Sequence, residues 1–320
     1  MTTTVQTGTG KYEKILERCQ DLEPVPTSVA YPCDETSLAG AIDAAAQGLI
    51  APILVGPENT IREIARAKGI DLGGAAIEDV PDSRSAAARA VALVREGKAE
   101  LVMKGSLHSD EILAAVIAKE TGLRTGRRLS HAFLMDVPTY HKVLIVTDGA
   151  INIAPTLEDK VHIVQNAIDL ARSFGVERPK VAILAAVESV NSKMPATLDA
   201  AALCKMADRG QIKGGVLDGP LAFDNAINLD AAKTKRIESE VAGDPDILVA
   251  PDLESGNIMA KMLTFLANAE ASGLVLGAKV PVILTSRADS LRARIASTAV
   301  AVLAADARRK KGPDSRPRAH

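Results

Sequence analysis

Short apolar runs alternate with longer amphipathic stretches along most of the chain. Seven of these runs are rich in β-branched residues and end in polar or turn residues, namely 51–57, 99–106, 142–149, 180–189, 214–220, 246–254 and 280–287. Strands that are buried on both faces of a sheet have this composition. The pattern therefore predicts an α/β protein with a mostly parallel sheet, whose strands are connected by helices through right-handed crossovers.

Three helices are predicted from their N-terminal caps and apolar faces. Ser109 caps one of them, and Thr156 with Asp159 makes a capping box at the start of another. The apolar face of this second helix consists of Leu157, Val161, Val164, Ile168 and Ala171. A third helix follows the turn at 255–256, and we predict a buried stripe on it from the helical spacing of Ile258, Met262 and Leu266.

One pair of strands interrupts this alternation. The run 129–136 directly precedes the run that begins at Lys142, with Pro138 between them. A helical crossover does not fit into so short a connection, so we predict an antiparallel hairpin and a domain junction at this point.

Composition limits the classes of protein that fit. A chain of 320 residues with 47% hydrophobic and 24% charged residues suits two globular domains. The net charge of -2 gives no reason to expect nucleic acid or a membrane as a partner. Three cysteines without a CxxC pair argue against a disulfide framework and a zinc site. We expect a cytoplasmic protein, because the first ten residues are polar and no apolar run reaches membrane-spanning length.

Most predicted strands end in small or charged residues. In parallel sheets, ligands bind beyond the carboxyl ends of the strands, so we expect these residues to converge on one edge and to form a polar cleft. The strand-end residues are Lys104 to Ser106, Asp148-Gly149, Glu188-Ser189, Asp218 to Pro220, Asp252 to Glu254 and Ser286-Arg287.

Common nucleotide and metal motifs are missing from the sequence. Gly8 and Gly10 lack the third glycine of a dinucleotide fingerprint, and there is no P-loop, GxSxG or HExxH motif. The histidines at 108, 131, 141 and 162 are scattered, and we interpret them as surface or packing residues. We therefore expect neither a metal site nor a tightly bound cofactor.

Three segments remain as candidates for chemistry. In 280–290, Ser286, Arg287 and Asp289 follow a strand and lie in one turn before a helix. This arrangement suits the binding of a phosphate dianion. A strand-end arginine that pairs with a surface carboxylate explains the same residues equally well. In 251–263, Asp252 and Glu254 lie at the start of a helix, and the backbone amides there suit an anion or a pantetheine carbonyl. Alternatively, Asp252 and Glu254 only cap that helix. In 147–160, Asn152 and Pro155 lie in a substrate loop or a plain connector.

Taken together and in this order, the segments resemble the phosphate acetyltransferase and phosphate butyryltransferase family. The resemblance runs from about Ala51 to Ala304, and its signature stretches are GGVLDGPLAFDNAI, PDLESGNIMAKML and the strand ending in Ser286-Arg287. DGAINIAPTLEDK and SHAFLMD support it.

The resemblance implies a fold, a reaction and a site. The fold would be two α/β/α three-layer domains around a cleft, similar to the isocitrate and isopropylmalate dehydrogenases, with residues 1–134 and 273–320 in the first domain and 135–272 in the second. The first domain would carry the Ser-Arg phosphate site, and the second the coenzyme A and substrate side. The chain would transfer an acyl group, acetyl before butyryl, between coenzyme A as co-substrate and phosphate. Independently of the resemblance, we expect a symmetric homodimer, because this is the commonest oligomer of soluble proteins. Implied catalytic residues are Ser286, Arg287 and Asp289, and implied substrate-binding residues are Lys104, Ser130, Asn152, Pro155, Asp252, Glu254 and Asn257.

The sequence departs from the family pattern at two positions. Gly149 replaces the cysteine that is usual in acetyltransferases, and Ala293 replaces a usual aspartate seven residues after Ser286, so that Asp289 is the nearest carboxylate. These changes leave open the general base and the acyl preference. A decarboxylating 2-hydroxy-acid dehydrogenase and a catalytically inactive sensor of acyl phosphate or coenzyme A are the alternatives.

Overall fold

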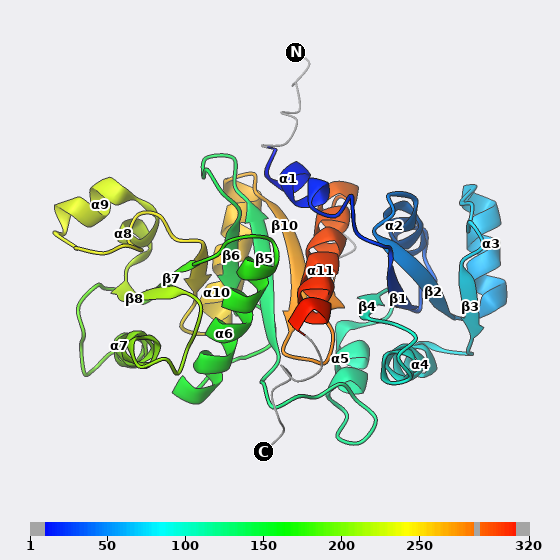
Figure 1. The fold of residues 1–320 in the computed structure, drawn as a ribbon, viewed down its shortest axis with the longest axis horizontal. Coiled ribbons are helices and arrows are strands. Elements are labelled where there is room, and N and C mark those ends of the chain that lie inside the picture. Colours follow the sequence, from blue (N-terminus) through cyan, green and yellow to red (C-terminus); the bar gives the residue numbers. More distant parts are fainter. Residues whose placement is uncertain (1–9, 285–288, 312–320) are drawn as a thin grey trace, which may run out of the picture.

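The computed structural model describes residues 10–284 and 289–311 (Figure 1). Its centre is a mixed sheet of eleven strands with the order β3-β2-β1-β4-β11-β10-β5-β6-β9-β7-β8. The strands are β1 Val25–Ala30, β2 Ile50–Gly56, β3 Ala76–Asp79, β4 Leu101–Lys104, β5 Ser130–Asp136, β6 Leu144–Thr147, β7 Lys180–Leu184, β8 Val216–Leu221, β9 Ile247–Val249, β10 Glu270–Leu276 and β11 Val282–Ile283. The helices are α1 Lys11–Glu17, α2 Glu35–Ala46, α3 Glu58–Lys68, α4 Ser83–Arg95, α5 Ser109–Ile117, α6 Leu157–Ser173, α7 Pro195–Asp208, α8 Phe223–Ile227, α9 Leu229–Thr234, α10 Leu253–Leu266 and α11 Leu291–Lys311.

The sheet consists of two parallel halves joined by antiparallel strands. In the first half, β3, β2, β1, β4 and β11 are parallel, and in the second half, β6, β9, β7 and β8 are parallel. Between the halves, β10 is antiparallel to both β11 and β5, and β5 is antiparallel to β6. The predicted α/β class and the predicted hairpin of β5 and β6 are confirmed.

This topology corrects the expectation that all polar strand ends converge on one edge. Following the pairing from β11 through β10 and β5 to β6 reverses the strand direction three times. The strands of the two halves therefore run in opposite directions, and their carboxyl ends form two separate groups. One group contains the end of β4, and the other contains the ends of β6, β7, β8 and β9.

One face of the sheet is covered by a continuous apolar core. This core takes buried residues from α1, α2, α3, α6, α7 and α11 and from strands of both halves. Figure 1 shows α6 and α11 side by side over the middle of the sheet, and the two helices are in contact. The two halves are thus tied together on this face.

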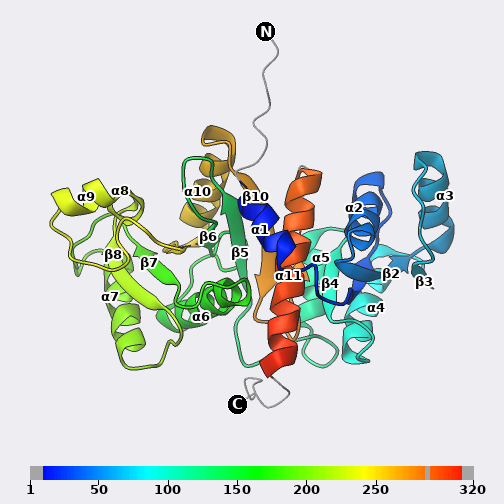
Figure 2. The same cartoon turned by 45° about the horizontal axis from the view of Figure 1, so that its top comes forward.

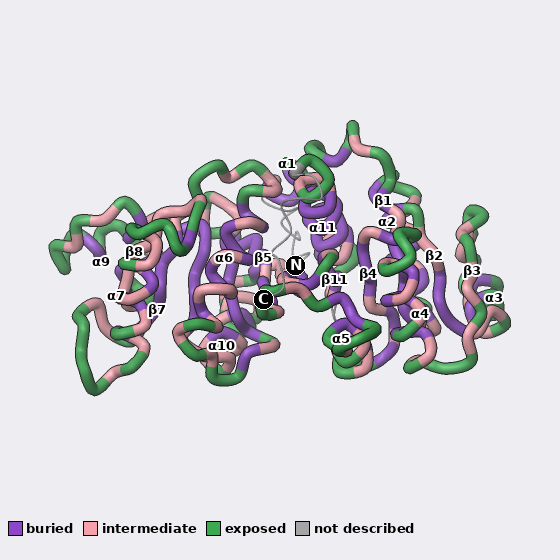
Figure 3. The backbone as a smooth tube through the Cα atoms, turned by 60° about the horizontal axis from the view of Figure 1, so that its bottom comes forward, coloured by how far each residue is buried: buried purple, intermediate pink, exposed green. Residues whose placement is uncertain are grey.

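The opposite face carries two apolar clusters instead of one. The first lies under α4 and α5, and the second lies among β6, β8, β9, α8 and α9, with residues of α10 packed against it. In Figure 3, α5 and α10 lie on either side of the middle of the sheet. The boundary between the two clusters follows β10 and β5, so this strip joins the two halves without a shared core on this face.

The predicted helices are observed with two corrections. Thr156 and Asp159 form the predicted capping box of α6, and its predicted face packs into the continuous core. In α5, the cap position is His108, and Ser109 is the first helical residue. In α10, the stripe that was predicted to be buried is exposed: Ile258 is 58% exposed, Met262 54% and Leu266 76%. The periodicity identified an apolar face correctly, but no element of the described chain covers it.

Candidate functional site

The carboxyl end of β4 lies where the strand order of the first half reverses. β2 and β3 lie on one side of β1 in the sheet, and β4 lies on the other side of β1. Gly105 lies so close to the loop after β1 that an added Cβ would be 2.3 Å from the carbonyl oxygen of Tyr31. Ser106 donates its hydroxyl to the Tyr31 carbonyl (3.0 Å) and accepts from the Cys33 amide (3.3 Å). Such a reversal point is where parallel sheets bind ligands.

Lys104 lies at the end of β4, next to the end of β11. Its ammonium group donates to the carbonyls of Gly105 and Leu107, both at 3.1 Å. Since Ile283 of β11 pairs with Met103 of β4, the segment that follows β11 begins beside Lys104. Ser286 and Arg287 lie outside the described residues. Asp289 is half-buried and lies two residues before the start of α11, with Ser290 between them.

A charged cluster fixes the start of α11, and Figure 2 shows α1 lying against this helix. Arg292 of α11 forms ion pairs with Glu13 of α1 (2.9 Å) and with Glu270 of β10. Lys11 pairs with the buried Asp136 at 2.8 Å. The cluster brings together four elements, and it holds the helix that follows the Ser-Arg segment in a fixed place.

At the carboxyl end of β6, Asp148 organises the predicted substrate loop. Its side chain is buried and accepts from the backbone amides of Ala150 (2.9 Å), Ile151 (3.1 Å) and Asn152 (3.3 Å). It also accepts from the side chain of Asn152 at 2.5 Å. One carboxylate thus receives four hydrogen bonds, which is the satisfaction that a buried charge requires.

Asn152 and Ser130 belong to one hydrogen-bond network next to this loop. The amide oxygen of Asn152 accepts from Arg128 Nε at 2.6 Å, and its nitrogen also donates to the Leu129 carbonyl at 2.8 Å. Ser130 is buried and accepts from Asn166 of α6 at 2.9 Å. Both predicted residues are therefore held by neighbouring protein groups. Arg128 is 53% exposed and also forms an ion pair with Asp159 of α6 at 3.2 Å.

The start of α10 packs directly on the Asp148 loop. An added Cβ at Gly256 would be 2.3 Å from the Asp148 carbonyl oxygen, so only glycine permits this approach. Asn257 donates to the Gly149 carbonyl at 2.9 Å. The structure therefore brings Asn152 and Asn257 to opposite sides of one loop.

The remaining predicted residues have more local surroundings. Asp252 is the N-cap of α10 and accepts from the amide (2.8 Å) and hydroxyl (2.6 Å) of Ser255. These hydrogen bonds lower the pKa of Asp252, and the charge of Lys160 contributes less. Glu254 is exposed in the first turn of α10, and Pro155 is half-buried before α6. Asp252 thus has the capping role that the sequence left open.

Between the two edges, His131 and Phe133 of β5 face the boundary of the two apolar clusters. Alternate residues of β5, Ala132 and Leu134, belong to the continuous core on the other face. The rings of His131 and Phe133 are in edge contact, with centroids 4.3 Å apart. An added Cβ at Gly273 of β10 would be 2.7 Å from Nε2 of His131 and 3.3 Å from the Leu284 carbonyl oxygen. His131 therefore lies between the last described residue before the Ser-Arg segment and the Asp148 loop.

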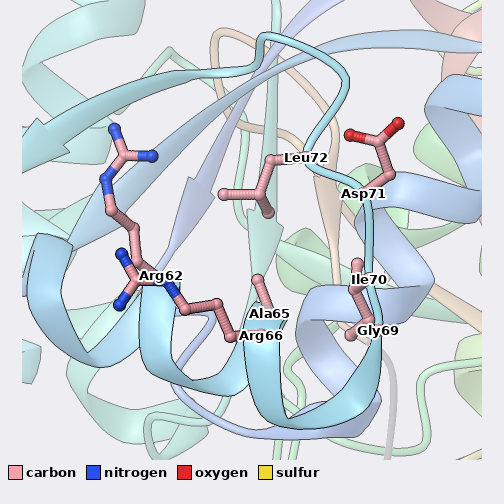
Figure 4. Close-up of a pocket in the computed structure, with 7 residues that line it drawn as sticks. All are labelled: Arg62, Ala65, Arg66, Gly69, Ile70, Asp71 and Leu72. Atoms are coloured by element: carbon pink, nitrogen blue, oxygen red, sulfur yellow. The ribbon is translucent and has the colours of Figure 1, made fainter.

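Two hollows in the surface of the first half lie apart from these residues. One, of about 350 Å³, is lined by residues of α3 and the turn after it, including Arg62, Arg66 and Leu72 (Figure 4). The other, of about 950 Å³, shares the turn 69–72 and extends to α2 and β2. None of the predicted site residues lines either hollow, so we assign neither to the chemistry.

Other findings apply only to the described part of the chain. Within residues 10–284 and 289–311, no group of three or more His, Cys, Asp or Glu side chains is arranged to hold a metal ion. Cys19, Cys33 and Cys204 are free, and burial raises the pKa of each thiol, to about 12 for Cys204. No helix of the described segments is long and apolar enough to cross a membrane.

Sequence reasoning missed several residues that the structure places at these edges. The sequence indicates Asp148 only as a strand end, whereas the interpretation of His131 as a packing residue agrees with its burial against Phe133. A usable signal existed, because the alternation of a strand puts His131 and Phe133 on one face and Ala132 and Leu134 on the other. Arg128 and Asn166 have no comparable signal, since their contacts depend on how α6 packs against the loop before β5.

Comparison with solved structures identifies the class of protein. The fold superposes on a branched-chain phosphotransacylase from Enterococcus faecalis with a TM-score of 0.76 and 30% identity, covering 87% of this chain and 98% of that one. A phosphotransacetylase from Streptococcus pyogenes gives a TM-score of 0.75 at 24% identity, over 94% of this chain and 97% of the other. A 4-hydroxythreonine-4-phosphate dehydrogenase from Klebsiella pneumoniae shares the fold more distantly, with a TM-score of 0.54 and 16% identity over 89% of this chain and 98% of the other.

Sequence comparison then gives the family. The model of the family described as phosphate acetyl/butaryl transferase matches residues 81–302. A phosphate acetyltransferase of Rhizobium meliloti is 61% identical over 93% of this chain and 95% of its own length. A phosphate butyryltransferase of Clostridium acetobutylicum is 43% identical over 92% of this chain and 98% of its own. The chain belongs to the phosphate acetyl/butyryl transferase family, as its signature stretches predicted.

Proposed function

We propose that this chain is a phosphate acyltransferase, which reversibly transfers an acyl group between coenzyme A and phosphate. The observation that carries the proposal is family membership over most of the chain, together with two polar strand edges that flank β5 and β10. Acetyl is the proposed acyl group, because the relative with 61% identity is a phosphate acetyltransferase. Butyryl is the second candidate, since butyryltransferases also match and small residues surround the 148–155 loop.

In the proposed mechanism, the coenzyme A thiolate attacks the carbonyl carbon of the acyl phosphate. The tetrahedral intermediate collapses, the bond between the carbonyl carbon and the phosphate oxygen breaks, and thioester and phosphate leave. Arg287 binds the phosphoryl group bidentately, and Ser286 donates a hydrogen bond to the oxyanion or to the thiol. Asp289 is the proposed base or the group that orients Arg287. Lys104 adds positive charge at the edge where this segment begins.

We further propose that the sheet divides into the two domains expected from the sequence, 1–134 with 273–320 and 135–272, arranged as in the isocitrate dehydrogenases. The separate apolar clusters under α4–α5 and α8–α10 support this division, because each half has its own core on one face. The cleft would then lie over the boundary that β5 and β10 form. In this arrangement Ser130, Asn152, Pro155, Asp252, Glu254 and Asn257 supply the coenzyme A and substrate side.

The deciding assay measures phosphate-dependent release of free thiol from acetyl-, propionyl- and butyryl-coenzyme A. We expect activity with both acetyl and butyryl substrates and a preference for acetyl, since each methylene contributes only about 1 kcal/mol of discrimination. No phosphate-dependent release with any substrate would refute the proposal. Stabilisation by NAD, and not by coenzyme A, would favour the dehydrogenase alternative. Stabilisation by coenzyme A without turnover would favour the sensor.

Substitutions in the Ser-Arg segment test the roles in this mechanism. Arg287→Lys keeps the charge but removes the planar fork, so we expect a loss of at least tenfold in turnover. Ser286→Ala is expected to act mainly on kcat. If Asp289 is the base, the loss in Asp289→Asn shrinks as pH rises, because the thiol then ionises without help. Full activity of both Arg287→Lys and Ser286→Ala would mean that the phosphate site lies elsewhere.

We also propose that the enzyme is a symmetric homodimer, and that it works in the cytoplasm on small-molecule substrates. The support for a dimer is the uncovered apolar face of α10, where Phe265 is 78% exposed in addition to the stripe of Ile258, Met262 and Leu266. A second copy would bring the same exposed apolar residues to the interface, as a two-fold axis requires. The free cysteines fit a reducing compartment.

Phe265→Asp tests the dimer. A carboxylate in a two-fold apolar interface meets its own copy and loses hydration, so we expect a monomer in sedimentation velocity where the unaltered chain is a dimer. Leu198→Asp on α7 is the matched control, because Leu198 is also exposed (43%) but lies on another helix. A Phe265→Asp dimer would place the interface elsewhere.

A further inference from the structure

Helix α1 lies across the two strands that join the halves of the sheet. Its Tyr12 is fully buried, and the Tyr12 hydroxyl is 2.9 Å from the carbonyl oxygens of Leu134 on β5 and Glu270 on β10. Either oxygen can accept its hydrogen. Glu270 is paired with Asp136, the last residue of β5. One side chain of α1 therefore bridges both joining strands at the end of their ladder.

Two charged residues of α1 extend this bridge toward the halves themselves. Lys11 pairs with the buried Asp136 at 2.8 Å and donates to the Val137 carbonyl at 2.6 Å, at the point where the chain leaves β5 for the second half. Glu13 accepts from Nη2 of Arg292 with both carboxylate oxygens, each at 2.9 Å. Arg292 belongs to α11, which packs against α2 and β11 of the first half. Ionic contacts thus run from α1 in both directions.

The residues that follow α1 add further contacts on both sides. Arg18 lies against Gly175, just after α6 of the second half, and leaves no room there for a side chain. Cys19 lies on α11, with its Sγ 3.5 Å from the Ala299 carbonyl oxygen, and it belongs to the apolar core that the two halves share. The segment 11–19 is therefore in contact with the first half, the second half and the strands between them.

The rest of the sheet shows what such a bridge could restrain. Among the described residues, the face opposite α1 carries two separate apolar clusters instead of a shared core. A hinge motion needs a joint and parts that move as units. The paired strands β5 and β10 supply the joint, and each cluster belongs to one moving unit. At the far end of the ladder, Arg127 before β5 pairs with Asp169 of α6 at 2.5 Å, so releasing α1 would free only one end of the joint.

We propose that α1 is a strap that sets the angle between the two halves of the sheet. With α1 seated on β5, β10 and α11, the halves are held at one angle. When its contacts are released, the halves turn relative to each other about β5 and β10. The inference does not use the proposed acyltransferase activity, so its outcome is separate from that of the thiol-release assay.

The test measures this angle through a distance across the face with the two clusters. Ala114 of α5 and Lys233 of α9 are exposed and are replaced by a ketone-bearing amino acid that takes a spin label, which leaves the cysteines untouched. Labelled protein is diluted with unlabelled protein, so that double electron–electron resonance reads distances within one chain. With the strap unaltered, we expect one narrow distance distribution.

Two substitutions loosen the strap, and a third is the matched control. Tyr12→Phe removes the hydroxyl that bridges the joining strands, and Glu13→Gln removes the charge that pairs with Arg292. In each we expect a distance distribution about twofold wider, because turning about a joint moves remote positions most. Glu100→Gln removes an ion pair of 2.6 Å with Arg309 of α11. That pair joins α11 to the residue before β4 and does not reach the second half, so the distribution should stay unchanged.

Thermal melting shows that each variant is folded. Widening in either strap variant, with the control unchanged, supports the inference. An unchanged distribution in both Tyr12→Phe and Glu13→Gln would overturn it, because α1 would then add only local stability. Equal widening in Glu100→Gln would also overturn it, since the loss of any ion pair of α11 would then loosen the molecule. If Glu13→Gln does not fold, Tyr12→Phe decides, because it removes a single oxygen atom and keeps the buried ring.

Discussion

The two faces of the central sheet are built differently. One face has a single apolar core that joins helices from both halves, whereas the other has two clusters with a boundary along β10 and β5. Polar and aromatic residues, His131 and Phe133, lie on the divided face, and Ala132 and Leu134 of the same strand lie on the continuous one. The same strand thus contributes aliphatic side chains to the shared core on one face and ring side chains to the boundary between two clusters on the other.

A pair of isoleucine substitutions gives the strongest test of this difference. Ile145 belongs to the continuous core and Ile112 to the cluster under α4 and α5, and both are fully buried. We expect each change to alanine to cost about 2–5 kcal/mol of unfolding free energy. Hydrogen exchange followed by mass spectrometry should show faster exchange in both halves for Ile145→Ala, and mainly in α4 and α5 for Ile112→Ala. Equal acceleration of α8 and α9 in Ile112→Ala would show that the two clusters are not independent.

A substitution at the Asp148 loop sharpens the comparison on the divided face. An added Cβ at Gly149 would be 2.8 Å from Cε2 of Phe133 and 3.3 Å from the backbone of Gly256. We therefore expect Gly149→Ala to cost about 1–3 kcal/mol and to lower thiol release. The additional change Phe133→Leu makes room, so the double variant should recover part of the stability, as measured by urea unfolding. Purely additive losses in the double-variant cycle would mean that the contact with Phe133 is unimportant.

The smallest expected effect concerns the cap of α10. Asp252→Ala should cost about 1 kcal/mol at neutral pH, the usual value for an N-cap. Because hydrogen bonds from Ser255 lower the pKa of folded Asp252, its contribution is present above the ordinary aspartate value of 3.8 and disappears as the pH falls further. The stability difference between the two proteins should therefore vanish in acid, as measured by urea unfolding at several pH values.

Glu254→Ala is the control for that series, because Glu254 is exposed in the same helical turn. It should change stability by less than about 0.5 kcal/mol at every pH. A pH-independent loss in Asp252→Ala would contradict a role for the ionised carboxylate.

Sequence patterns predicted the strands that have strong apolar runs and missed three others. All seven predicted runs contain a strand, and the hairpin of β5 and β6 is also observed. The missed strands have weaker signals: β1 contains Pro26, Thr27 and Ser28, β3 has only four residues, and β10 begins with Glu270. Their strand conformation follows from pairing with neighbours, which local composition does not encode.

The candidate site also has one part that the sequence predicted and another part that it did not. The loop with Asn152 and the start of α10 were predictable because motifs identify them, and Lys104 followed from its strand end. Contacts between distant segments follow from strand pairing. Gly256 meets Asp148 because β9 pairs in parallel with β6, and Arg128 meets Asn152 beside the hairpin of β5 and β6. The helical spacing of apolar residues also predicts that α10 has an apolar face, but it cannot state whether the same chain or another covers it.

The place of β11 in the sheet has a consequence for synthesis on the ribosome. β4 pairs with β1 on one side and with β11 on the other, and β11 is formed by residues 282 and 283 near the end of the chain. A nascent chain therefore carries β4 as an open strand edge while the whole second half is translated. Open edges of this kind invite pairing with other chains, so this edge of the growing polypeptide is exposed to such pairing until residues 282 and 283 have emerged.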